Sequence, residues 1–186
     1  MGRWSWSSRN TVEECLSIDI PWLSSHGYFC GFKSGGIEWK NSLGEVTSSI
    51  GIQVSVVEGF GGNHIRFQYT QTDNYIREKS ELDYKVELVN TPCNYGGVRY
   101  WFICPLVVNG KDCRRRVAKL YLPPGGKYFG CRHCYNLTYE SCKKHDKRVD
   151  ALRKLPPEAL VKLVNSGSEG QALLALKAGM ESLKRF

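Results

Sequence analysis

Apolar and polar residues alternate with a period of two through the middle of the chain, between residues 36 and 90. Neighbouring side chains of a strand point to opposite faces, so each such run predicts a strand with one apolar and one polar face. Four runs fit: Ile37 and Trp39; Ile50, Ile52, Val54 and Val56; Ile65, Phe67 and Tyr69; and Tyr84, Val86 and Leu88. We expect an antiparallel meander with one face packed and the other in water.

Residues 10–29 predict two short helices. Thr11 and Glu14 have the spacing of a capping box, which can start the first. Asp19 can start the second, which Gly27 ends. Two short helices in succession would fit a helix-turn-helix motif, but the segment is not especially basic. A helical lid over the sheet is therefore the favoured interpretation.

Residues 143–186 predict a helical tail, basic at first and amphipathic afterwards. The pair Pro156–Pro157 begins one helix, which ends near Asn165, and the capping pair Ser168 and Gln171 begins another. The second helix carries apolar residues at helical spacing, namely Leu173, Leu176, Met180 and Leu183. Such a stripe packs against the rest of the protein or against a partner.

The 186 residues include eight cysteines, which in a reducing compartment are more often metal ligands or buried thiols than disulfides. Cys131 and Cys134 form a C-x2-C pair, and Cys104 and Cys113 flank a loop with its own Asn109–Gly110 turn. Structural zinc sites take four soft ligands at tetrahedral corners. These four cysteines therefore predict one structural zinc ion.

The elements around the cysteines predict a zinc ribbon. Residues 98–103 form a strand that leads into Cys104, and residues 115–122 form a second strand. The turn Pro123–Gly126 then leads into a return strand over residues 127–130. The fold class expected for the whole chain is α+β, an antiparallel β-meander plus a zinc-ribbon hairpin. It divides into an N-terminal helical segment, a β-sheet region, the ribbon and the helical tail, at residues 1–30, 31–92, 93–142 and 143–186.

Other interpretations of the cysteines remain open. Cys131, Cys134, Cys142 and His145 give a C-x2-C-x7-C-x2-H pattern, a second possible ligand set. The C-x2-C pair is also a redox motif, although no βαβ pattern surrounds it. His133, inside the pair, is expected to face solvent or a ligand. The remaining cysteines are interpreted as buried thiols, namely Cys15, Cys30 and Cys93.

Two segments of the chain carry a resemblance to a known family. Residues 91–105 read TPCNYGGVRYWFICP, and residues 115–142 read RRVAKLYLPPGGKYFGCRHCYNLTYESC. Together they resemble an uncharacterised family of bacterial and phage-associated zinc-ribbon proteins. The match is dense over residues 91–142 and looser before it, and residues 143–186 depart from the more basic tail of the family. The resemblance implies the four-cysteine site and a phage or mobile-element setting, and it brings no established activity.

Positive charge is concentrated beside the cysteines. The formal net charge is +8, of which residues 93–154 contribute +10, residues 1–92 −3 and residues 155–186 +1. A local basic face attracts polyanions, and exposed rings can stack on unpaired bases. The leading hypothesis is therefore a DNA- or RNA-binding protein. The candidate contact residues are Arg114, Arg115, Arg116, Lys119, Lys127, Tyr128, Arg132, Lys143, Lys144, Lys147 and Arg148.

Enzymatic activity is not expected, and no small-molecule substrate is evident. A zinc ion held by four sulfurs keeps no open position for water, and the four histidines are scattered along the chain. The alternative function is a protein-interaction module that docks on a larger nucleic-acid-processing or defence complex. The chain has no run of eighteen apolar residues, and its first ten residues do not resemble a signal peptide. We therefore expect a cytoplasmic protein without membrane contact.

Overall fold

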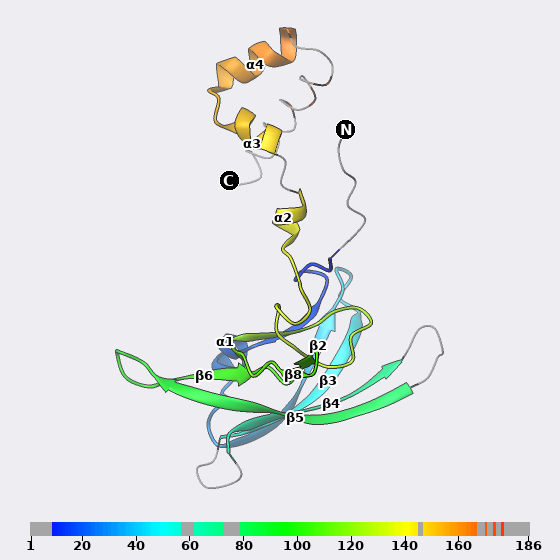
Figure 1. Ribbon diagram of the computed structural model, residues 1–186, viewed down its shortest axis with the longest axis vertical. Coiled ribbons are helices and arrows are strands. Elements are labelled where there is room, and N and C mark those ends of the chain that lie inside the picture. The colour runs from blue at the N-terminus through cyan, green and yellow to red at the C-terminus, as the bar shows by residue number, and fades with distance from the viewer. Residues whose placement is uncertain are drawn as a thin grey trace. The chain divides into compact units, whose positions relative to one another are not determined.

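The computed structural model divides the chain into two compact units, Met1–Tyr139 and Glu140–Phe186, and each is described by itself. The residues that the structure describes are 9–56, 62–72, 79–144, 147–166, 170, 173 and 176. Both units are drawn in Figure 1.

A six-stranded antiparallel sheet forms the body of the first unit (Figure 1). Its strands lie in the order β2-β3-β4-β5-β6-β9, so the first five follow one another as a meander. Their bounds are β2 Phe32–Lys40, β3 Val46–Ser55, β4 His64–Thr72, β5 Lys79–Pro92, β6 Val98–Ile103 and β9 Arg116–Val117. The four predicted strands correspond to β2–β5, which confirms the α+β class and the meander.

The core lies on one face of this sheet. The inward positions of β3 and β4 are buried in alternation, as Val54, Ile65 and Phe67 show with 0% exposure each. A two-stranded ribbon and a short helix contribute further side chains to the same hydrophobic cluster. The ribbon pairs β1 (Leu16–Asp19) with β10 (Lys119–Leu122), and the helix is α1 (Ile20–Ser25).

Only the second of the two N-terminal helices forms. In α1, Asp19 caps the helix by accepting a hydrogen bond from the Trp22 backbone N–H at 2.8 Å, and Gly27 follows with a φ of +68°. The prediction of the first helix was wrong. The Thr11 N–H does donate to the Glu14 carboxylate at 2.9 Å, but the chain makes one turn and then enters β1. Strand pairing with β10 outweighs the local capping signal.

The strands predicted for the zinc ribbon, residues 115–122 and 127–130, are shorter than expected. The strand over residues 115–122 is broken at Ala118, where the chain passes from pairing with β6 to pairing with β1. The return segment makes only one bridge, between Tyr121 and Gly130. The preceding carbonyls have other partners, since Gly126 O accepts from the Gln71 side chain and Lys127 O from the Tyr69 hydroxyl. The return segment therefore hydrogen-bonds mainly to side chains of β4 and does not form a continuous strand beside β10.

The second unit contains three short helices within the residues that the structure describes: α2 Glu140–Lys144, α3 Lys147–Arg153 and α4 Pro157–Ser166. Helix α4 matches the helix predicted from the proline pair. Most of the predicted amphipathic helix after residue 167 lies outside the described residues. Within the described part of the chain, no helix has both the length and the apolar character that a membrane span requires.

Phe129 is the side chain that holds the return segment to the sheet. It is 1% exposed and its ring contacts those of Phe67, Tyr69 and Trp39, with centroids 5.3, 5.9 and 6.4 Å away. We expect Phe129→Ala to lower the free energy of unfolding by about 3–5 kcal/mol in urea denaturation, because it leaves a cavity. Tyr95→Ala, at a fully exposed ring, is the control and should change it by about 0.5 kcal/mol or less. Equal effects would contradict this account of the core.

Candidate metal centre

The first pair of cysteines lies at the base of a tight hairpin. Cys104 directly follows β6, and Cys113 follows the hairpin of β7 (Val107–Val108) and β8 (Lys111–Asp112). The predicted Asn109–Gly110 turn is present, with φ of +52° and +74°, the left-handed values that such two-residue turns need. Backbone hydrogen bonds from Cys113 N to Leu106 O and from Cys104 N to Arg115 O, both 2.9 Å, close the loop.

The second pair lies on a compact turn. The Cys134 N–H donates to the Cys131 sulfur at 3.4 Å, and the Tyr135 N–H donates to the Cys131 carbonyl at 3.3 Å. Asn136 then has a φ of +48°, which lets the Leu137 N–H return to the Arg132 carbonyl at 3.0 Å. The turn is closed by its own backbone, so both sulfurs point to one side.

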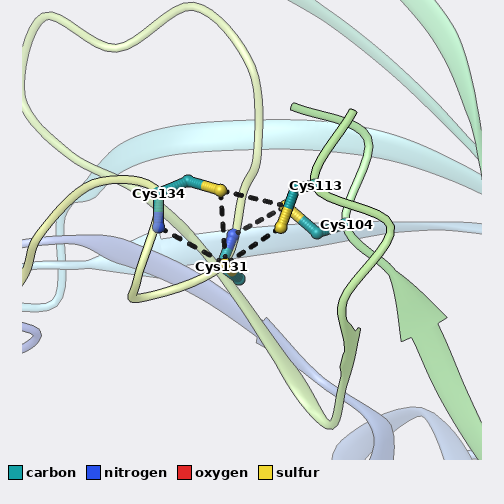
Figure 2. A group of neighbouring side chains, drawn as sticks. All are labelled: Cys104, Cys113, Cys131 and Cys134. Atoms are coloured by element: carbon teal, nitrogen blue, oxygen red, sulfur yellow. Dashed lines mark hydrogen bonds between the residues drawn. The ribbon is translucent and has the colours of Figure 1, made fainter. Parts of the chain in front are cut away.

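The two pairs bring four sulfur atoms together (Figure 2). The Sγ atoms all lie within 4.8 Å of one another, and the closest separations are 3.8 Å for Cys104–Cys134, 3.8 Å for Cys113–Cys131 and 3.5 Å for Cys131–Cys134. A tetrahedral ion with metal–sulfur bonds of about 2.3 Å requires sulfurs about 3.8 Å apart. Disulfide sulfurs would be about 2.05 Å apart, so these cysteines are free. The cluster can hold a metal ion.

The surroundings of the cluster favour one thiolate, at Cys131. Cys104 and Cys131 are buried, and the Cys131 N–H donates to the Cys104 sulfur at 3.3 Å. Hydrogen bonding with the Cys104 thiol lowers the pKa of the Cys131 thiol, and the same hydrogen bond raises the pKa of the Cys104 thiol. Burial raises the pKa of the Cys134 thiol. One negative charge is thus accommodated readily, and further thiolates need a cation among them.

Close packing at Gly130 sets the approach of the two pairs. A Cβ atom on Gly130 would lie 2.1 Å from Leu106 Cδ1 and 2.7 Å from Leu106 Cγ. Leu106 belongs to the first loop, and Gly130 directly precedes Cys131 of the second turn. A larger residue at position 130 would therefore require the Leu106 side chain to move.

The other cysteine interpretations have mixed outcomes. Cys142 is exposed and belongs to the second unit, and His145 lies outside the described residues. The interpretation of the remaining cysteines as buried was wrong. Cys30 is exposed, and Cys15 and Cys93 are only half-buried. His133 is exposed, as predicted for a residue inside the turn.

The arginines after Cys113 point to different partners. Arg114 donates to the Glu87 carboxylate at 2.9 Å, so its charge is already balanced. The Arg116 guanidinium lies 5.6 Å from the centroid of the Trp101 ring, and the Arg99 guanidinium lies 5.7 Å from it. Arg99 and Trp101 were not among the predicted contact residues. Their alternation on β6 with the buried Phe102 is the signal that could have found them.

A second group of cations and rings lies around β10. The Lys119 ammonium is 5.8 Å from the Tyr121 ring and 3.6 Å from the Asp19 carboxylate. The Arg132 guanidinium is 5.0 Å from the ring of Tyr139. We call this group the Tyr121 cluster (Lys119, Tyr121, Arg132 and Tyr139). The group around Trp101 described above is called the Trp101 cluster (Arg99, Trp101 and Arg116).

The other predicted contact residues are spread over both units. Arg115 and Lys127 are exposed, and Tyr128 is 44% exposed with its ring against Tyr84. Lys143 and Arg148 are exposed on the second unit. The side chains of Lys144 and Lys147 lie outside the described residues.

Comparison with known proteins gives no assignment: no family model, no curated protein and no solved structure matches the chain.

The cluster predicts a metal-dependent fold in this part of the chain. Cys131→Ser should abolish stoichiometric metal binding and lower the melting temperature, because metal affinity contributes directly to folding. Cys142→Ser, at an exposed cysteine of the second unit, should change neither. Elemental analysis and thermal denaturation of the two proteins check this. Loss of metal in the Cys142 variant instead would favour the alternative ligand set.

Proposed function

We propose that the protein is a zinc-dependent nucleic-acid-binding protein without enzymatic activity. The observation that carries the proposal is the pairing of cations, exposed at Arg116 and half-buried at Arg132, with aromatic rings on the segments that also supply the four cysteines. Arg116 follows Cys113 by three residues, and Arg132 lies inside the second cysteine turn. Metal binding would therefore fix these groups in place.

Zinc is the ion that the ligand set favours. Four thiolates at tetrahedral separation are typical of structural zinc sites, whereas magnesium and calcium take oxygen ligands. Four sulfur ligands would leave no open position for water, which fits a structural role. The zinc ion would hold residues 104–113 against residues 131–134, and it would not take part in chemistry.

The two clusters offer what a single strand of DNA or RNA requires. Arginine and lysine neutralise phosphates, and exposed rings stack on bases irrespective of their sequence. In the Trp101 cluster, Arg99 and Arg116 are exposed and Trp101 is half-buried. A cation beside a ring can contact a phosphate while the ring contacts the neighbouring base. The phage or mobile-element setting remains part of the proposal and rests on the sequence resemblance alone.

Exposed apolar residues favour a protein partner as the second candidate. Val107 and Val108, at the tip of the first cysteine loop, are 60% and 41% exposed. On the second unit, Val161, Leu173 and Leu176 are 59%, 71% and 53% exposed. Apolar side chains of this kind gain from burial against another protein. A larger nucleic-acid-processing or defence complex would combine both roles.

Charge reversal within the two clusters tests nucleic-acid binding. The triple variant Arg99→Glu, Arg116→Glu and Arg132→Glu should bind single-stranded DNA or RNA more weakly in fluorescence anisotropy. The slope of log K against log salt concentration should be smaller in magnitude by up to about 0.7 for each phosphate that the variant no longer neutralises.

The matched control reverses three exposed lysines outside the clusters, Lys33, Lys40 and Lys79, and so changes the net charge equally. Zinc content and melting temperature are measured for both variants. The proposal predicts that the control retains most of the affinity. An equal loss in both variants would indicate only a net-charge effect, and absence of binding by the zinc-loaded wild type at low salt would overturn the proposal.

A further inference from the structure

The meander opens into a fork between its second and third strands. Strands β3 and β4 pair from Ser55–His64 to Gly51–Gln68 and no further. Beyond that point β3 continues beside β2 through Val46, while β4 continues beside β5 through Thr72. Figure 1 shows β3 rising away from the hairpin of β4 and β5. Residues 47–50 and 69–72 thus form two diverging strand edges, which we call the fork.

Gly51 lies at the apex of the fork. Gly51 is the last residue of β3 to pair with β4, and a Cβ atom there would lie 3.4 Å from the Gln68 carbonyl oxygen. No backbone hydrogen bond joins the two edges of the fork in the described part of the chain. Alternate residues of an unpaired edge present N–H and C=O groups outward, so the fork offers donors and acceptors to a ligand.

A cavity of about 730 Å³ occupies the fork, between the two strand edges and the turn Pro123–Gly126. Its volume lies in the range of small-molecule sites. The Gln71 Nε2 group donates to Gly126 O at 2.7 Å, which holds the turn over the fork. The Oε1 atom of the same side chain is buried and has no hydrogen-bond partner among the described residues. Because that atom is enclosed by protein, the role of Gln71 in the fork is to position the turn rather than to contact a ligand.

The lining of the cavity combines polar and apolar residues and is almost uncharged. Residues with hydroxyl or amide groups, such as Ser48, Thr70 and Gln68, line the wall together with Trp39. Glu14 is the one charged side chain among the described residues that line it. Without a lysine or arginine the site has nothing to neutralise a phosphate, and the carboxylate disfavours anions.

We propose that the fork binds an uncharged saccharide of one or two rings. Sugar hydroxyls both donate and accept, so they match the backbone edges and the hydroxyl-bearing residues of the fork. The Trp39 indole provides a flat apolar surface for one sugar ring. This site is separate from the basic clusters, since neither Arg99, Arg116 nor Arg132 lines the cavity. Its test is therefore independent of nucleic-acid binding.

Saturation-transfer NMR with the full-length, zinc-loaded chain tests the proposal. The probes are glucose, maltose, cellobiose and N,N′-diacetylchitobiose, with glucose 6-phosphate as an anionic probe and tetraalanine as a peptide probe. At least one neutral sugar should receive saturation at millimolar concentration, and the anionic probe should not. Gln71→Ala removes the hydrogen bond that holds the turn at Gly126 over the fork, and it should weaken binding of that sugar about tenfold.

Two serines of β3 provide a second, matched pair of variants. Ser48 lines the cavity and Ser55 does not, and both are half-buried. Ser48→Arg should fill the cavity and abolish sugar binding, whereas Ser55→Arg should preserve it, with zinc content and melting temperature compared in both. The proposal is overturned if no neutral sugar binds, if only tetraalanine or the phosphate binds, or if Ser48→Arg and Gln71→Ala leave sugar binding unchanged in folded protein.

Discussion

The convergence of four sulfur atoms is the constraint on which the rest of the first unit depends. Cys104 and Cys113 come from one loop and Cys131 and Cys134 from another, and their sulfurs all lie within 4.8 Å of one another. Bringing distant segments together costs chain entropy, and bringing thiolates together costs electrostatic repulsion. A metal cation offsets both costs at once. The two loops would otherwise be joined mainly by contacts such as that of Leu106 with Gly130.

The cysteine site is built into the large sheet rather than standing beside it. Cys104 directly follows β6, a strand of the sheet, and Cys131 follows the buried Phe129 by two residues. A displacement of the cysteine turn would thus also shift the packing of Phe67 and Trp39, because both rings contact Phe129. The same segments carry the Trp101 and Tyr121 clusters. The cysteine cluster, the core and the basic clusters therefore share the same segments, and the proposed nucleic-acid binding would depend on a metal bound at the cysteines.

The sequence predicts the parts of this fold that depend on strong local patterns. Alternation of apolar residues located β2–β5, and the Asn109–Gly110 pair located the β7–β8 turn. The four cysteines were chosen from eight by spacing and by the turns around them. Prediction failed where a distant partner decides the outcome. Leu16 pairs with Leu122, across more than a hundred residues, and this pairing makes a strand where the capping signal of Thr11 predicted a helix.

Surface chemistry was harder to predict than the fold. Basic residues could be identified from the sequence, but their partners could not, because an ion pair such as Arg114 with Glu87 depends on how β5 passes the cysteine loop. The same reason hid the Trp101 cluster, in which residues of β6 and β9 meet across the sheet. The fork also escaped prediction. Its position follows from where β3 and β4 stop pairing, and polar residues at strand ends do not reveal that point.

The coordination of the metal is the most direct test of this account. X-ray absorption at the zinc edge, on protein purified without added chelator, measures the number and type of ligand atoms. The account predicts a single shell of four sulfur atoms at about 2.3 Å. A shell that includes nitrogen or oxygen ligands at about 2.0–2.1 Å would contradict it, because histidine or water would then replace one of the four cysteines.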